Sequence, residues 1–337
     1  MKISPIATFN INKINQQNKI QYKTNLPCDT VSFSAKRKKT DNQQTNPRIT
    51  TSVKVGEELY AKLEAGANKK DITRIIQEKI PTLQVAPLRE MESQVAYADT
   101  FAGYFASEIA DDFSMNRSFM YLNEKPFIIG DKTEKMSFAL DVAHEYTHAQ
   151  QVVSGKDAEF YKKISNGDAQ MARTITAMSN ITYQLMDKEM QTITLPQIFA
   201  NPIDMLNFRK YGKEIPREAY VTKNTLLTNA KCTNEIQYKK MIENEFQNAF
   251  IRTVQFIIEH PENIEPSIFD TLMQIGEEGK IDELCEKTKQ MCSYIAENEA
   301  EARTTECVMA KNLLGVRKTL NIDCYTIYYD MLSKALK

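Results

Sequence analysis

The chain has 337 residues, 42% of them hydrophobic, so it is long enough to bury the core of one large domain or two modest ones. Its formal net charge of -1 gives no electrostatic reason to expect nucleic-acid binding by the molecule as a whole. With only 10 Gly and 11 Pro, the composition favours long helices joined by short loops over an all-β protein with many tight turns.

No stretch approaches the roughly 20 consecutive apolar residues that a membrane span needs, so we expect none. The six cysteines form no CxxC pair and are irregularly spaced, which favours free thiols in a reducing compartment. The amino terminus lacks the apolar run of a secretory signal. Cytoplasmic residence is therefore the default expectation, and export by a non-classical route stays open.

Residues 1–50 differ in composition from the rest of the chain. They carry nine Lys or Arg against two acidic residues, a net charge of +7, and twelve Asn or Gln. Such a segment cannot bury enough apolar surface to offset the entropy lost on ordering. We expect a disordered basic arm over 1–50, acting either as a flexible tail or as a targeting or docking signal.

From residue 51 onward, helical patterns dominate. Asp71 is the expected N-cap of its helix, and Pro81 its stop. One pair of strands is expected at 118–122 and 126–129, where β-favouring residues flank a short polar turn. The expected helices are 56–63, 71–80, 91–110, 133–153, 158–189, 216–230, 235–259, 266–275, 281–314 and 319–336.

These patterns predict a mostly α fold with a small β-hairpin or sheet (α+β). Residues 51–337 are expected to form one domain. Its first part, 51–155, holds the strand pair and the helix at 133–153. Its second part, 156–337, is helical.

The residues that indicate chemistry are the pentapeptide His144-Glu145-Tyr146-Thr147-His148, an HExxH motif. On a helix, positions i and i+4 lie on one face, so His144 and His148 can direct their ring nitrogens at one metal ion. Glu145 lies beside that ion, where it can take a proton from a water molecule. Zinc suits imidazole and carboxylate ligands and does no redox chemistry. At the chain's own His and Glu frequencies, chance gives roughly two such matches per thousand chains.

The run from Ala143 to Gln151 resembles the zincin metallopeptidases, and is similar to HExxHxxQ segments in bacterial and phage-associated zincin-like proteins. It departs from the zincin pattern at Gln150, where a hydrophobic residue is usual. The resemblance implies a zinc-dependent metallopeptidase that acts on a peptide or protein substrate. It also implies that the HExxH helix packs behind an edge strand, which the strand pair at 118–129 is expected to supply.

A catalytic zinc site needs a third protein ligand. No histidine follows at the short metzincin spacing, and His260 stands at a helix end, where we expect a surface or capping residue. A glutamate is therefore expected, as in the gluzincin type. The segment 294–303 resembles the ExEA pattern on the second metal-binding helix of gluzincins. Its Arg303 replaces an acidic residue that often orients a histidine there.

Glu299 is the favoured third ligand, because it falls on the apolar stripe of its helix. Glu297 points away from that stripe. Glu301 at its edge and Glu218 in the segment 216–220 stay open as alternatives.

In the expected mechanism, Glu145 is the general base, and a further donor stabilises the oxyanion. The tyrosines that could supply this donor are Tyr220, Tyr325, Tyr328 and Tyr329. Two alternatives remain: a non-catalytic helical interaction protein, and a secreted bacterial effector with a basic docking arm.

Overall fold

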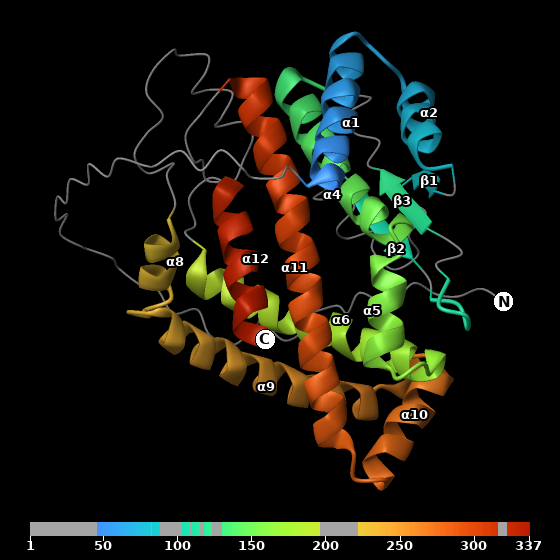
Figure 1. The fold of residues 1–337 in the computed structure, drawn as a ribbon, viewed down its shortest axis with the longest axis vertical. Helices are drawn as coiled ribbons and strands as arrows, with labels where there is room; N and C mark the ends of the chain where they lie inside the picture. Colours follow the sequence, from blue (N-terminus) through green and yellow to red (C-terminus); the bar gives the residue numbers. More distant parts are fainter. Residues whose placement is uncertain are drawn as a thin grey trace.

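The computed structural model describes residues 46–81, 83–87, 103–107, 109–114, 118–122, 130–195, 222–315 and 322–337. Within these ranges the protein is mostly helical, as predicted, with one small sheet (Figure 1). None of the helices described is both long and apolar enough to cross a bilayer.

The sheet has three strands in the order β1-β3-β2. β3 (Ser118–Leu122) lies in the middle, parallel to β1 (Leu83–Pro87) and antiparallel to β2 (Gly103–Ser107). The predicted strand at 118–122 is confirmed, whereas its predicted partner at 126–129 lies outside the described residues. The helix predicted over 91–110 is wrong at 103–107, because pairing with β3 overrides the local helical pattern.

The first two helices begin at residues with clear capping roles. α1 (Pro47–Glu64) starts with proline at N1, and the Asn46 side chain accepts a hydrogen bond from Arg48 N. It therefore begins well before residue 56, inside the range expected to be an arm. α2 (Lys69–Lys79) is capped by Asn68, with Asp71 at N3 completing a capping box, so the predicted Asp71 N-cap is wrong.

The HExxH segment lies on α4 (Lys132–Val153), which matches the predicted helix, and Gly155 adopts a positive φ of 74° just beyond it. The single helix predicted at 158–189 is instead two, α5 (Lys156–Ile164) and α6 (Ala169–Thr194). Asn166 and Gly167 both have positive φ between them, which no α-helix tolerates.

Most of the C-terminal helices lie close to their predicted positions, and α9 and α11 match at both ends. The C-terminal helices are α8 (Lys223–Asn229), α9 (Glu235–Glu259), the 3-10 turn η4 (Pro261–Asn263), α10 (Pro266–Glu277), α11 (Ile281–Leu314) and α12 (Ile322–Leu336). Of the helix predicted at 216–230, residues 216–221 lie outside the described ranges.

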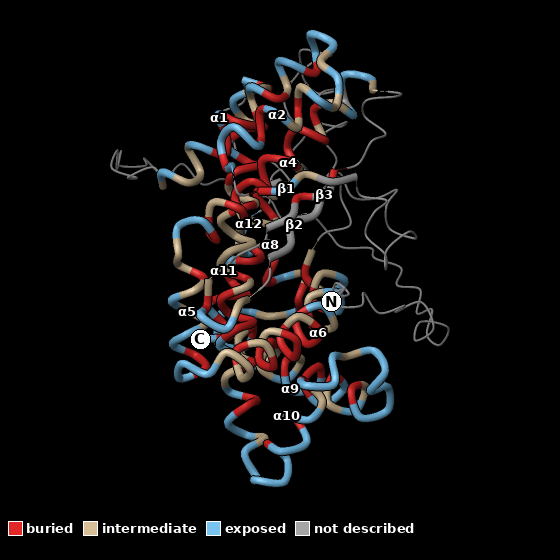
Figure 2. The backbone as a smooth tube through the Cα atoms, turned by 90° about the vertical axis from the view of Figure 1, so that its right-hand side faces the viewer, coloured by how far each residue is buried: buried red, intermediate tan, exposed pale blue. Residues whose placement is uncertain are grey.

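Two hydrophobic cores share α11, which runs the length of the molecule (Figure 1). One core joins α6, α8, α9, α10 and α12 to the first half of α11, up to Ala296. The other joins α1, α2, β1, β3 and α4 to its end, from Cys307. Most residues of α11 and α4 are buried or half-buried (Figure 2). The part of α11 between Ala296 and Cys307 therefore faces α4 where the two cores meet.

Candidate metal centre

Packing against α1 and α11 fixes the HExxH segment of α4. Val142, Ala143, Tyr146 and Ala149 are buried in the core shared with α1. The hydroxyls of Thr147 and Thr305 are hydrogen-bonded at 2.9 Å, which ties α4 to α11 inside the core. The helix therefore cannot rotate, and its two histidines are held facing α11.

Three side chains converge from α4 and α11. His144 Nε2 and His148 Nε2 lie 3.1 Å apart. Glu299 places Oε2 3.5 Å from the first nitrogen and Oε1 3.3 Å from the second. On a tetrahedron with bonds of about 2.05 Å, neighbouring ligand atoms lie about 3.3 Å apart. The three side chains thus have the spacing of zinc ligands.

The other ring nitrogen of each histidine has an acceptor beside it. His148 Nδ1 lies 2.9 Å from Gln151 Oε1, and His144 Nδ1 lies 2.6 Å from Glu306 Oε1. Glu306 Oε1 does not lie in the direction of the N–H bond of His144. The contact between Glu306 and His144 is therefore a close ion contact rather than a straight hydrogen bond. Both acceptors favour a proton on Nδ1, which leaves the Nε2 lone pairs facing each other and Glu299.

The pKa values of His144 and Glu299 without a metal ion reflect this convergence of acceptors. Burial and the charge of Arg303 lower the pKa of His144, but the carboxylates of Glu306 and Glu299 outweigh both and raise it to about 10. Burial alone would raise the pKa of Glu299, yet His148 and His144 bring it well below its usual value. The cluster therefore attracts positive charge, which a proton or a metal ion can supply.

Arg303, which is partly exposed, pairs with the buried Glu306 beside His144. Arg303 Nη1 lies 2.8 Å from Glu306 Oε1, one turn along α11. Burial raises the pKa of Glu306, but Arg303 and His144 outweigh burial and lower it. The resemblance to gluzincins leads us to expect an orienting acid at position 303, which is Arg; the acid beside His144 is instead Glu306, one turn later.

The remaining candidate glutamates have other surroundings. Glu145 is half-buried on α4, and among the described residues no hydrogen bond or ion pair engages its carboxylate. Glu301 is held by Arg48 at 2.7 Å, and Glu297 by Lys156 at 3.4 Å. Glu218 lies outside the described residues. Of the glutamates described, only Glu299 joins the two histidines.

His260 ends α9 and is exposed, in agreement with a surface or capping role. Tyr328 and Tyr329 both direct their hydroxyls at Asp187 on α6, at 2.7 and 3.2 Å, so neither is an unengaged donor. The Tyr325 ring packs on the Arg303 guanidinium, 5.2 Å from its centroid. Tyr220 lies outside the described residues.

Sequence reasoning missed Glu306, and it gave no role to Gln151, the last residue of the HExxHxxQ segment. Glu306 stands seven residues after Glu299, two helical turns on, so the same periodicity that selected Glu299 places it on the same face. Gln151 stands three residues after His148, again on one face. Both residues could therefore have been predicted from their spacing to a metal ligand that was already identified.

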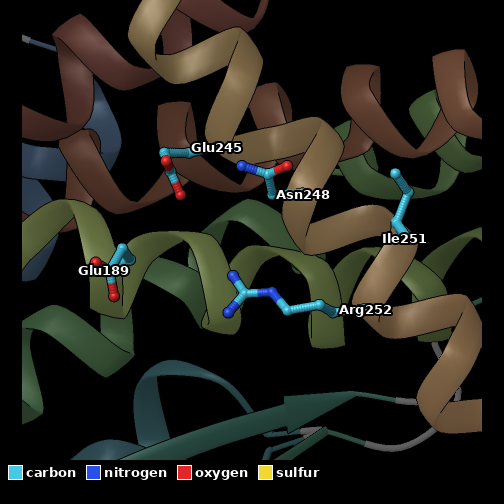
Figure 3. Close-up of a pocket in the computed structure, with 5 residues that line it drawn as sticks. All are labelled: Glu189, Glu245, Asn248, Ile251 and Arg252. Carbon is cyan, nitrogen blue, oxygen red and sulfur yellow. The ribbon is translucent and has the colours of Figure 1, made fainter. Parts of the chain in front are cut away.

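A shallow hollow elsewhere has no such chemistry. It lies between α6 and α9 and is lined by Glu189, Glu245, Asn248, Ile251 and Arg252 (Figure 3). It contains neither histidine nor cysteine, and none of its residues belongs to the metal-ligand group. The residues that line this hollow therefore give no reason to regard it as the functional site.

Comparisons with family models, curated proteins and solved structures find no match to this chain. Its function must therefore be argued from the site itself.

Proposed function

We propose that this protein is a zinc-dependent hydrolase of peptide bonds, with His144, His148 and Glu299 as metal ligands and Glu145 as general base. The observation that carries the proposal is the approach of the three side chains: the two Nε2 atoms lie 3.1 Å apart, and Glu299 places Oε2 3.5 Å from that of His144 and Oε1 3.3 Å from that of His148. Two facing imidazole lone pairs and a carboxylate repel one another unless a proton or a metal ion lies between them.

The donor set favours zinc among common metals. Two imidazoles and one carboxylate, with no thiolate among them, form the ligand set of hydrolytic zinc sites that leave a fourth position for water. Zinc bound there would supply a Lewis acid and lower the pKa of its water towards about 7.

The chain's own residues would carry the proton transfers and hold the ligands. Glu145 follows His144 directly, and its carboxylate is engaged by no described partner, so it can accept a proton from water and return it to the leaving amine. Gln151 and Glu306 hold the two imidazoles in the tautomer that offers Nε2.

A peptide substrate is supported by the resemblance to zincins and by the sheet. β2 packs on α4, and among the described strands it pairs only with β3. An extended peptide could add along the other side of β2 as a further strand. This corrects one expectation: β3, the last strand described before α4, is central, and β2 is the outer strand that packs on the HExxH helix.

The test compares two substitutions on α4 in zinc-loaded full-length protein. Glu145→Gln should retain one zinc per chain and lose at least about 100-fold in cleavage of a quenched-fluorescent peptide library. Glu134→Gln changes an exposed glutamate in the first turn of the same helix and should leave both unchanged. Full activity in Glu145→Gln, or a zinc-loaded wild type that cleaves no peptide, would contradict the proposal.

A further inference from the structure

The beginning of α1 is connected to a metal ligand through side-chain contacts. Arg48 grips Glu301 with two bonds, Nε to Oε1 at 2.7 Å and Nη2 to Oε2 at 3.0 Å. Asn46 Nδ2 adds a third bond to Oε1 at 2.8 Å. Glu301 stands two residues from Glu299 on α11, and its side chain is only 10% exposed. A bidentate contact from arginine to a nearly buried carboxylate fixes the orientation of the carboxylate and keeps it ionised.

Glu301 in turn orients Gln151, which is 1% exposed. Gln151 Nε2 donates to Glu301 Oε2 at 3.3 Å and to the Asn298 carbonyl at 3.2 Å. Both partners are acceptors, so the amide nitrogen must face α11 and the amide oxygen must face the other way. A flipped amide would set its oxygen against a carboxylate.

The amide oxygen of Gln151 is the atom that lies 2.9 Å from His148 Nδ1. An acceptor at that position requires a hydrogen on Nδ1, and so leaves the Nε2 lone pair for the metal. The orientation of Gln151, set by Glu301, therefore decides which nitrogen His148 presents to the metal.

We propose that Arg48 is a positioning residue for the metal centre, acting through Glu301 and Gln151 on His148; this inference rests on the proposed zinc site. Residue 48 is 100 positions from the histidine that it positions, in the first turn of α1. The start of α1 is thereby part of the metal centre, and displacing it weakens the hold on the metal.

The chain supplies a matched control in Glu57, which also lies on α1 and also bonds α11. Its Oε1 accepts from Asn312 Nδ2 at 2.8 Å, without contact to Gln151. Glu57→Ala removes a bond between the same two helices, so an effect on helix packing alone would appear in both variants.

The experiment measures zinc affinity of the full-length protein by competition with a chromophoric chelator. Loss of a direct outer-shell partner typically costs about 10- to 100-fold in affinity, which we expect for Gln151→Ala. Arg48→Ala, one step further out, should lose about 3- to 10-fold. Arg48→Lys should recover part of this loss, because lysine restores the positive charge but cannot form the two parallel hydrogen bonds of the guanidinium. Glu57→Ala should bind as the wild type does.

Two further readouts separate positioning from general loosening. In a double-mutant cycle, Arg48→Ala should add nothing to Gln151→Ala, because the first acts only through the second. The visible spectrum of the cobalt-substituted protein should change in Arg48→Ala and not in Glu57→Ala. Wild-type affinity in Arg48→Ala, or a full additional loss in the double variant, would overturn the coupling alone. A wild type that binds no zinc would overturn the proposed function with it.

Discussion

Glu306 Oε1 lies 2.6 Å from Nδ1 of His144, on the side of the ring away from Glu299. One imidazole is therefore held between two carboxylates of the same helix, two turns apart. Glu299 faces the nitrogen that can bind metal, and Glu306 faces the nitrogen that carries the proton. Arg303 neutralises Glu306, so the pair orients the ring without adding a full negative charge.

Removing the charge of Glu306 should weaken zinc binding. We expect Glu306→Gln to lower zinc affinity about 10- to 100-fold, because an amide is a poorer acceptor for His144 Nδ1. Isothermal titration or chelator competition measures the change. Glu297→Gln is the control and should bind normally; Glu297 is a half-exposed glutamate on the same helix that pairs with Lys156 and Lys337. Equal affinity in both variants would refute the role given to Glu306.

The identity of the third ligand is tested by comparing three glutamates. Glu299→Gln should abolish stoichiometric zinc, because the other two ligands alone leave the ion with too few protein donors. Glu301→Gln should retain zinc at reduced affinity, since its carboxylate acts only through Gln151. Glu218→Gln should have no effect. Elemental analysis after dialysis distinguishes the three, and zinc retained by Glu299→Gln but lost by Glu218→Gln would reverse the assignment.

Close packing of α1 against the HExxH helix gives a stability prediction. A Cβ on Gly56 would lie 2.4 Å from Met309 Sδ and 2.8 Å from the Cβ of Ala143, the residue before His144. Although alanine favours a helix over glycine by about 1 kcal/mol, Gly56→Ala should destabilise the fold by about 1–3 kcal/mol.

Gly276 is the control for Gly56, because the space around it on α10 is open. Gly276→Ala should stabilise by up to about 1 kcal/mol in chemical denaturation. If both substitutions shifted stability in the same direction, the close approach of α1 to α4 and α11 would be refuted.

Asp187 should make stability depend on pH. Burial raises its pKa to about 6, although hydrogen bonds from Tyr328, Gln191 and Tyr329 lower it. A folded pKa above the unfolded value means that the folded state binds the proton more tightly. The cost of the buried charge is therefore present above pH 6 and is relieved as the pH falls towards 4.

Between pH 7 and pH 5, with chelator present, the wild type should gain about 1.3 kcal/mol of unfolding free energy relative to Asp187→Asn. Urea titrations at each pH measure this difference, in which groups common to both proteins cancel. Parallel pH profiles would show that Asp187 keeps an ordinary pKa.

The sequence predicted the long helices well, and the reasons are local. α9 and α11 have sustained apolar periodicity, and proline or glycine lies beyond their ends, so their bounds required no tertiary information. At α6, the glycine signal at Gly167 was present but overlooked. At β2, five residues became a strand only because β3 pairs with them, which no local pattern contains.

The candidate site, like the fold, was predictable where it depends on local helical periodicity. The spacing of His144 and His148, and the apolar stripe that includes Glu299, both follow from helical periodicity, and the structure brings the three together. The contacts that start from Arg48 could not be predicted in this way, because Arg48 and Glu301 are 253 positions apart in the sequence. Only the packing of α1 beside α11 brings them into contact.

The central claim is that two histidines of α4 and one glutamate of α11 hold a zinc ion. Anomalous diffraction on both sides of the zinc absorption edge, from crystals of the purified protein, tests this most directly. We expect one peak about 2.0–2.2 Å from His144 Nε2, His148 Nε2 and a carboxylate oxygen of Glu299. A zinc-supplemented crystal with no peak there, or with the peak on other side chains, would contradict this claim.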